Sequence, residues 1–400
     1  MTERPLRVAM LGGRGIPANY SGFDTLIEEV STRLVAEHGM EVTVYCRKSS
    51  YRERPTFVRG VRCRYLPAIP GKGIESITHS CFSVWHALWH SYDLAFVVDP
   101  ANAPFALPLK LRRFPVVFHT DGLGWKRSKW SKVARAYYRR VEGFCARSAT
   151  ALVTDSRAMQ AYYREAWKAE SSFIPYGAHT HGGSDRSALT KLAIQERGYW
   201  LVVTRIEPEN NTDQIVRGYL ASGSLRPLIV VGGAKYESPY SRSLFAMASA
   251  NVRFVGPIYD PAALNGLYAN CFAYLHGHEV GGTNPGLLRA MDAGACCLAL
   301  DVAFNVEVLE DTGMFFAKDA PSIAQSLKTL ENEPDAALRR GLAVRERARR
   351  FYRWDAVAAG YAELFSRLVG SRKDQHLVAA AQTTEVYHPE RFAPLEEAIS

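Results

Sequence analysis

The sequence has 400 residues, of which 47% are hydrophobic and 22% are charged. At about 100–200 residues per domain this length predicts two domains with sizeable cores, and the composition excludes a disordered, collagen-like or coiled-coil chain. No run of about 18 apolar residues occurs, and the opening MTERPLRVAM lacks an extended apolar region, so we expect neither a membrane-spanning helix nor a signal peptide.

The positive charge is concentrated in the first half of the chain. The net charge is +9 overall, but residues 1–180 carry 26 basic and 15 acidic side chains, whereas residues 181–400 carry 23 and 25. A basic first half predicts anionic partners, such as phosphates or an anionic membrane surface, with a merely solubilising surface as the alternative. The seven cysteines show no C-x-x-C spacing, which favours a reducing compartment over a disulfide framework or a zinc site.

The first half alternates short apolar runs with helical patterns, which is typical of a parallel α/β sheet. We expect a helix over about 25–37, after the first strand and a glycine-rich turn. The predicted strands are Leu6–Leu11, Val42–Tyr45, Leu94–Val98, Val116–Phe118 and Ala151–Thr154.

The second half repeats this α/β pattern after a polar stretch at about 177–197, where glycine, serine, threonine and charged residues replace the apolar runs. The predicted strands are Tyr199–Thr204, Leu228–Val231, Val252–Val255, Phe272–Leu275 and Cys297–Leu300. We therefore expect a first domain at 1–178, a linker at 179–197, a second domain at 198–350, a closing helix at 351–370 and a tail at 371–400.

A glycine-rich loop, LGGRGIPANYSGFDT, follows the first predicted strand. Its Gly13-x-Gly15-x-x-Ala18 spacing matches the dinucleotide-binding pattern, but Pro17 delays the helix, and the next strand ends near Arg47 rather than in the acid that holds an NAD ribose. A nicotinamide enzyme is therefore only a weak alternative. We interpret the loop as backbone that approaches an anion or a sugar, with a plain tight turn as the other interpretation.

Polar residues follow the strand at 116–118 directly. His119 and Asp121 stand at the carboxyl end of that strand, where open α/β sheets bind ligands. Such a pair can orient a hydroxyl or stabilise a developing cation, and the alternative is a hydrogen-bonded turn.

The next segment, KRSKWSKVARAYYRR at 126–140, has the spacing of an amphipathic basic helix. Its apolar residues recur at helical intervals, and lysines and arginines lie on the other faces. This pattern predicts a core helix with a solvated charged face or, as the functional alternative, a dock for lipid head groups or a pyrophosphate. No recognisable nucleic-acid module accompanies it.

Two segments of the second half predict an anion site. Arg205 follows a strand and can clamp a diphosphate, with an ion pair to Glu207 or Glu209 as the alternative. In YLHGHEVGGTNPGLLRAMDAG, Thr283 or Asn284 caps a helix that starts at Pro285. Because a helix N-terminus attracts anions, we favour a phosphate site over a plain capped helix.

Six runs in chain order give the sequence a family resemblance over about residues 7–365. They are LGGRGIPANYSGFDTLIEEV, HTDGLGWKRSKW, LVTDSRAMQAYY with FIPYGA, VVTRIEPENN, GPIYDP and HGHEVGGTNPGLLRAM. Together they resemble bacterial rhamnosyltransferase-type enzymes of glycosyltransferase family 4. The resemblance implies a GT-B fold, in which two Rossmann-like domains with parallel sheets face each other across a cleft and a C-terminal helix crosses back to the first domain.

The resemblance also implies roles by position. His119 and Asp121 would be catalytic; on the acceptor side would lie Ser21, Gly22, Trp125, Lys126 and Arg127. The donor would contact Gly12, Gly13, Arg205, Asn210, Glu279, Gly281, Gly282, Thr283, Asn284 and Arg289.

The implied activity is a retaining sugar transfer without a metal or a cofactor other than the nucleotide-sugar donor. We expect L-rhamnose from dTDP-rhamnose and a lipid-linked or polysaccharide acceptor, with no nucleic-acid partner. We expect the protein in the cytoplasm, peripheral to the inner face of an anionic membrane. A UDP- or GDP-sugar donor, or a transferase-like scaffold without activity, stays open.

The sequence departs from the family pattern at three places. Arg289 stands where the family has a Glu that holds the donor ribose, and a guanidinium offers only hydrogen-bond donors. Gly124 replaces the Glu of a D-G-L-E-W-K-R pattern, and the lysine that commonly follows the clamping arginine is missing near Asn210. These departures motivate the scaffold alternative.

Overall fold

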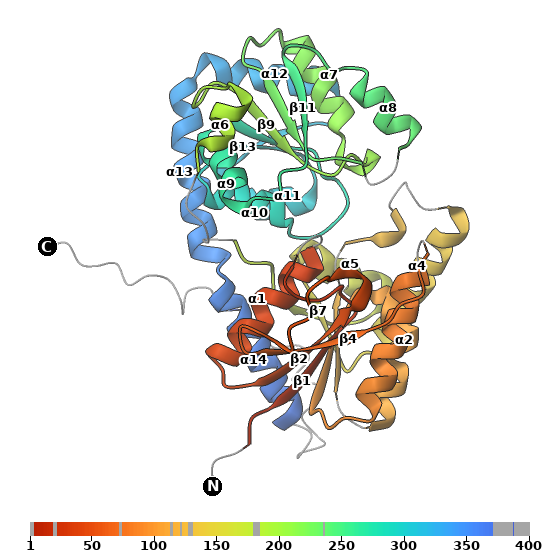
Figure 1. Ribbon diagram of the computed structural model, residues 1–400. Helices are drawn as coiled ribbons and strands as arrows, with labels where there is room; N and C mark the ends of the chain where they lie inside the picture. Colours follow the sequence, from red (N-terminus) through yellow and green to blue (C-terminus); the bar gives the residue numbers. More distant parts are fainter. Residues whose placement is uncertain are drawn as a thin grey trace, which may run out of the picture. The chain divides into compact units, whose positions relative to one another are not determined.

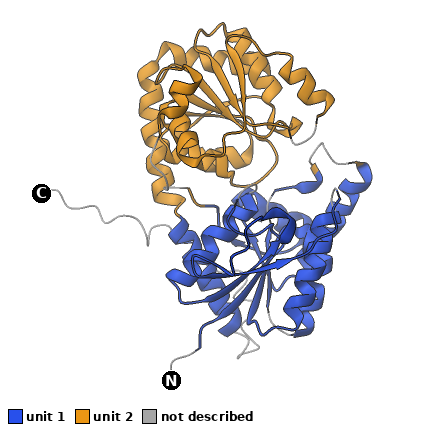
Figure 2. Cartoon of the chain, in the orientation of Figure 1, with its two compact units in different colours: residues 1–125, 132–176, 354–392 blue, residues 126–131, 177–353, 393–400 orange. Residues whose placement is uncertain are grey.

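The computed structural model describes residues 4–18, 22–71, 74–112, 115–120, 122–126, 131–178, 185–234, 237–370 and 387. The chain forms two compact units (Figure 2). Unit 1 comprises residues 1–125, 132–176 and 354–392, and unit 2 comprises 126–131, 177–353 and 393–400. Each unit is described by itself below.

Unit 1 is built on an eight-stranded sheet (Figure 1). In sheet order its strands are β3 (Phe57–Val58), β4 (Val61–Leu66), β2 (Glu41–Arg47), β1 (Arg7–Leu11), β5 (Leu94–Val98), β6 (Val116–Thr120), β7 (Ala151–Thr154) and β8 (Ser172–Phe173). Every neighbouring pair is parallel except β3 with β4. Strands β5, β6 and β7 are buried throughout, which explains their continuous apolar runs.

Helices cover both faces of the unit 1 sheet. They are α1 (Gly22–Ala36), α2 (Ile74–Leu88), α3 (Ala103–Ala106), α4 (Lys132–Ser148), α5 (Arg157–Trp167) and α14 (Trp354–Gly370), with 3₁₀ turns η1 (Lys48–Ser50), η2 (Pro100–Asn102), η3 (Leu107–Arg112) and η4 (Gly124–Lys126). Helix α14 returns from the far end of the sequence to pack against α1. Helix α3 contacts both α2 and α4, which lie together in Figure 1.

Unit 2 is built on a six-stranded parallel sheet. In sheet order its strands are β11 (Val252–Gly256), β10 (Leu228–Val231), β9 (Trp200–Val203), β12 (Ala273–His276), β13 (Cys297–Leu300) and β14 (Met314–Phe316). Its helices are α6 (Ser187–Leu192), α7 (Thr212–Ser222), α8 (Pro239–Phe245), α9 (Pro261–Asn270), α10 (Pro285–Asp292), α11 (Ala303–Leu309), α12 (Ala320–Asn332) and α13 (Pro334–Phe351), with 3₁₀ turns η5 (Pro208–Asn210) and η6 (Glu310–Thr312). This strand order is that of a doubly wound Rossmann sheet.

The predicted α/β class with two parallel sheets and a returning C-terminal helix is confirmed. Each predicted strand is present to within a few residues, as is the first helix. Strand β4 and the short strands β3, β8 and β14 were not predicted. Among the described residues, no helix is long and apolar enough to cross a membrane.

The prediction for the basic helix at 126–140 needs correction. Helix α4 starts only at Lys132 and continues to Ser148, and residues 127–130 lie outside the described part of the chain. Two residues of the expected apolar stripe are exposed, Val133 at 80% and Tyr137 at 40%. The buried residues of α4 lie one to two turns later, among them Val141 and Cys145. The stripe is therefore not a core face in this structure.

Candidate functional site

Strands β9 and β12 define the point in unit 2 where the strand order reverses. They are neighbours, and the sheet extends from β9 towards β10 and from β12 towards β13. In doubly wound sheets, ligands bind outside the carboxyl ends of the two strands at such a switch point. The loops that follow β9 and β12 contain most of the predicted donor residues.

The loop after β9 is fixed by its own side chains. Asn210 Nδ2 donates to the Arg205 carbonyl at 2.7 Å. The guanidinium of Arg205 is 44% exposed and lies 4.0 Å from a Glu207 carboxylate oxygen, a distance that makes a weak ion pair. The loop therefore holds the backbone in place while the Arg205 side chain reaches solvent.

Direct contacts join the β9 loop to the β12 loop. His278 Nδ1 lies 2.5 Å from Asn210 Oδ1, and the Glu279 amide donates to the Glu209 carbonyl at 3.1 Å. Gly277 is needed between them, because a Cβ at this position would lie 2.4 Å from the Asn210 carbonyl oxygen. These contacts bring together Asn210 and Glu279, which were both predicted to bind the donor. Gly277 and His278 were not predicted from the sequence.

The Glu279 carboxylate binds two further side chains. One of its carboxylate oxygens accepts a hydrogen bond from Asn211 Nδ2 at 3.1 Å and one from Lys318 Nζ at 2.5 Å. Asn211 Nδ2 also donates to the Gly277 carbonyl at 2.8 Å. Lys318 follows β14 and lies more than 100 residues from Arg205 in the sequence, so the sequence spacing gave no sign that it joins this site.

The N-terminus of α10 completes this edge of unit 2. Asn284 is the N-cap, its Oδ1 accepting from the Gly286 amide at 2.8 Å, and Pro285 occupies the first turn. The preceding residues Gly281, Gly282 and Thr283 are buried. Free amides and the helix dipole make such a terminus attractive to an anion.

Arg289 has partners within unit 2. Its Nε donates to Asn265 Oδ1 at 2.7 Å, and its Nη2 donates to the Pro261 carbonyl at 3.0 Å, so the guanidinium ties α10 to α9. Burial lowers the pKa of Arg289. These contacts support a structural contribution, and the predicted donor contact of Arg289 stays a prediction.

His276, the last residue of β12, is buried and neutral. Its Nδ1 lies 2.9 Å from the Tyr274 hydroxyl. Burial, together with nearby His278, lowers the pKa of His276 to about 3. It therefore brings no positive charge to the site at neutral pH.

The glycine loop of unit 1 follows β1, which pairs with both β2 and β5 at the switch point of that sheet. Gly12 has φ +98°, and a Cβ there would lie 2.4 Å from the Val98 carbonyl oxygen. A Cβ at Gly13 would lie 2.5 Å from Ile27 Cδ1. Contact with the backbone and a positive φ therefore require glycine at position 12, whereas a side chain at position 13 would require the end of Ile27 to move. Gly12 and Gly13 lie in a different unit from the other predicted donor residues.

His119 lies in β6, one residue before its end, and is completely buried. Its Nδ1 lies 2.8 Å from the Tyr361 hydroxyl of α14, and rings of Phe23, Phe96 and Tyr176 surround it. These contacts fit an orienting or structural role in this structure. The catalytic role of His119 stays a prediction, and its partner Tyr361 lies 242 positions away.

Removing the Tyr361 hydroxyl should weaken unit 1. In Tyr361→Phe, His119 Nδ1 loses the bond at 2.8 Å inside an apolar cage. We expect a loss of about 1–3 kcal/mol in the free energy of unfolding, measured by urea denaturation. Unchanged stability would show that this bond does not contribute.

The other predicted residues of the first half of the chain are only partly described. Asp121, Ser21 and Arg127 lie outside the described residues. Gly22 is the first residue of α1, and Trp125 and Lys126 end turn η4. A Cβ at Gly124 would lie 3.3 Å from the ring of Tyr138, so a larger residue there would require that ring to move.

A buried carboxyl group supports Trp125. The Trp125 indole donates to the Tyr162 hydroxyl at 3.3 Å, and that hydroxyl donates to Glu142 Oε2 at 3.2 Å. Arg139 lies over the Trp125 ring at 5.1 Å. Burial raises the pKa of Glu142 to about 7, although hydrogen bonds from tyrosines oppose this.

This shifted pKa predicts that stability falls as pH rises from about 4.5 to about 7. In that window Glu142 ionises in the unfolded chain but stays protonated in the folded protein, whose pKa for this group is about 7. Glu142→Gln should remove this slope and be more stable at pH 8 by about 3 kcal/mol, at about 1.36 kcal/mol per pKa unit. Urea midpoints across pH test this, with exposed Glu165→Gln as control. An unchanged slope would contradict it.

Comparison with known proteins agrees with this architecture. Residues 22–177 match the model of a glycosyl transferase 4-like domain. No curated protein matches the sequence. Sucrose-phosphate synthase from Thermosynechococcus elongatus is 18% identical, with a TM-score of 0.74 over 92% of this chain and 100% of that one. HepE of Anabaena, solved in complex with UDP and glucose, is 15% identical, with a TM-score of 0.71 over 90% and 99%. A glycosyltransferase from Rickettsia africae is 11% identical, with a TM-score of 0.67 over 91% and 99%.

The fold of the whole chain is therefore that of GT-B glycosyltransferases. The match to the glycosyl transferase 4-like domain covers residues 22–177, most of which lie in unit 1.

Proposed function

We propose that this chain is a retaining glycosyltransferase that takes a sugar from a nucleoside diphosphate donor without a bound metal. The observation that carries the proposal is the construction of the unit 2 switch point. There the exposed guanidinium of Arg205, the linked loops after β9 and β12, and the N-terminus of α10 stand at one sheet edge. Arg205 and the helix terminus are groups that bind diphosphates.

These groups suit the chemistry of sugar transfer. The leaving nucleoside diphosphate gains negative charge in the transition state. A guanidinium and helix amides can stabilise that charge in the absence of a metal ion. Among the described residues, no group of three His, Cys, Asp or Glu side chains is arranged to hold a metal.

The proposed donor is dTDP-L-rhamnose, and the proposed acceptor is a lipid-linked or polysaccharide glycan of the bacterial cell surface. The rhamnosyl specificity and the retention of configuration rest on the sequence resemblance. The HepE structure contains UDP and glucose, which supports the broader class of nucleotide-sugar donors. The basic first half of the chain supports a cytoplasmic enzyme that works at an anionic membrane surface.

Calorimetric titration with dTDP, UDP, GDP, ADP and NADP tests the donor class. Selective binding of dTDP is the result we expect. Selective binding of UDP or GDP would still support a glycosyltransferase, but with a UDP- or GDP-linked donor sugar in place of dTDP-rhamnose. Absence of binding by all five would contradict the proposal and favour a transferase-like scaffold, with Arg289 as the first position to restore to glutamate.

A further inference from the structure

Helix α2 of unit 1 exposes several large apolar side chains and buries a mixed face. Its buried residues are His79, Ser80, Ser83, Val84 and Ala87. Its exposed large side chains are Ile74, Ile77, Phe82 and Trp85, and Trp89 follows directly after the helix. We name these five residues the apolar face of α2.

The apolar face of α2 is too aromatic for an ordinary solvated surface. The exposed fractions of Trp85 and Trp89 are 64% and 72%, and their ring centroids lie 6.0 Å apart. At 100° per residue, the five positions fall within one arc of the helix. Contiguous exposed apolar patches mark surfaces that bind a partner or a membrane.

Apolar residues of the adjoining turn enlarge this face. Turn η3 contacts α2, and Arg112 Nη1 donates to the Leu88 carbonyl at 2.7 Å. Leu107 and Leu111 of η3 are exposed, Leu111 at 81%. The exposed cation Lys110 lies between them.

The part of the sequence that contains α2, η3 and the start of α4 is rich in cations. Residues 76–140 contain ten lysines and arginines and only three acids, Asp93, Asp99 and Asp121. Asp93 pairs with Arg4, and Glu75, the acid at the start of α2, lies 3.3 Å from Arg47. The local excess charge is therefore positive.

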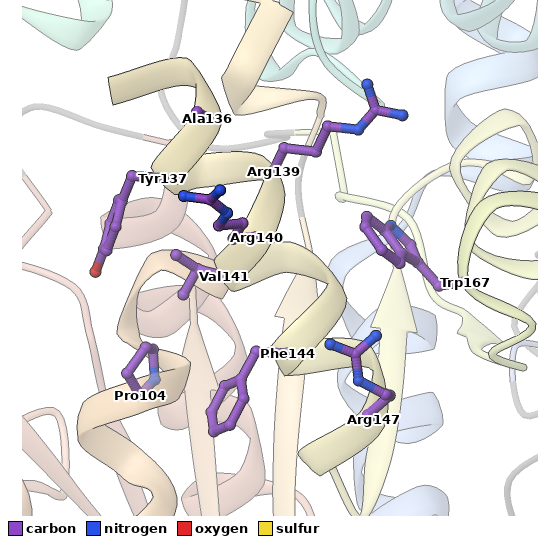
Figure 3. Close-up of a pocket in the computed structure, with 9 residues that line it drawn as sticks. All are labelled: Pro104, Ala136, Tyr137, Arg139, Arg140, Val141, Phe144, Arg147 and Trp167. Atoms are coloured by element: carbon purple, nitrogen blue, oxygen red, sulfur yellow. The ribbon is translucent and has the colours of Figure 1, made fainter. Parts of the chain in front are cut away.

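Helix α4 adds a groove of about 710 Å³ that is both basic and aromatic. Figure 3 shows Arg139, Arg140 and Arg147 along α4, with Phe144 between them and Trp167 of α5 to one side. Within the described residues, no carboxylate lies within ion-pair distance of Arg140 or Arg147. Pro104 of α3 also lines the groove, and α3 contacts α2.

We propose that unit 1 docks on an anionic lipid bilayer through the apolar face of α2 and turn η3, while the arginine groove of α4 holds lipid phosphates. Tryptophan with neighbouring cations is the combination that favours the interface of a bilayer. Positive charge and missing acids favour this occupant over a second copy of the same face, because two such faces would repel each other. The inference deepens the proposed function and rests on it for the lipid-linked acceptor.

Vesicle sedimentation of the full chain tests the inference. The protein should bind vesicles rich in phosphatidylglycerol and bind pure phosphatidylcholine much less. Trp85→Ser with Trp89→Ser should weaken binding by about tenfold or more, since the interfacial apolar area is lost. The matched control is Leu225→Ser with Tyr259→Ser, two side chains of unit 2 that are more than 80% exposed; it should bind like the wild type.

A second variant, which reverses two charges, measures the electrostatic contribution to vesicle binding. Lys110→Glu with Arg140→Glu should lose about fivefold or more in affinity for the anionic vesicles, with little change for phosphatidylcholine. Unimpaired binding of the tryptophan variant, or absence of wild-type binding to either vesicle, would overturn the inference. So would a wild-type dimer, seen by light scattering, that the tryptophan variant dissociates.

Nucleotide binding keeps this inference separate from the proposed function. The tryptophan and charge variants change no residue of the unit 2 site, so both should bind dTDP like the wild type. Vesicle binding without nucleotide binding would preserve the docking surface and reject the transferase. Nucleotide binding without vesicle binding would preserve the transferase and reject the docking surface.

Discussion

Arg205→Ala should weaken binding of dTDP by about 10- to 150-fold, the equivalent of about 1.5–3 kcal/mol for a hydrogen bond between charged groups. The effect should be large because the guanidinium is exposed and its ion pair with Glu207 is weak, at 4.0 Å. Folding should change little, since the Asn210 side chain bonds to the Arg205 carbonyl and not to its guanidinium. Calorimetry gives the affinity and urea denaturation gives the stability.

Arg217→Ala is the matched control for this variant. Arg217 is an exposed arginine on α7 of the same unit. Its removal lowers the net charge equally but should leave dTDP affinity unchanged. Equal weakening in both variants would reduce the role of Arg205 to general electrostatics, and unchanged affinity in Arg205→Ala would reject the predicted clamp.

Gly12→Ala should destabilise the protein by about 2–4 kcal/mol through a clash and an unfavourable backbone conformation. The added methyl would lie 2.4 Å from the Val98 carbonyl oxygen and 2.8 Å from Asn102 Nδ2, at φ +98°. Strands β1 and β5 pair beside this position, so neither group can move freely. The midpoint of urea unfolding measures the loss.

The control variant Gly39→Ala measures how much stability is lost through the backbone conformation alone, without a steric clash. Gly39 has φ +63°, and an added Cβ would meet nothing within 4 Å. This control should lose about 1 kcal/mol, the contribution of the left-handed conformation alone. If Gly12→Ala were no worse than Gly39→Ala, the close approach to Val98 would not matter to stability.

The strands and the order of the two units could be predicted because their signals are local. Buried parallel strands appear as apolar runs, as in LAFVV of β5 and LIVV of β10. The N-cap of α10 at Asn284 was likewise readable from one short segment. Edge strands such as β3 and β14 are two or three residues long and partly exposed, so they give little periodicity.

The rest of the site depends on contacts between distant segments. Tyr361 reaches His119 because α14 returns to unit 1, and no local pattern of α14 reveals its partner. The partners of Arg289 could not be predicted either, because Asn265 and Pro261 of α9 lie 24 and 28 positions away in the sequence. The exposure of the α2 tryptophans was also invisible, since an apolar stripe ordinarily predicts a buried face.

Backbone hydrogen exchange with and without dTDP tests the location of the proposed site most directly. The account predicts slower exchange in two segments of unit 2, residues 205–211 and 277–287, because a bound diphosphate would occupy the amides of α10 and order both loops. Protection confined to unit 1, or binding of dTDP without protection of the α10 terminus, would contradict the account.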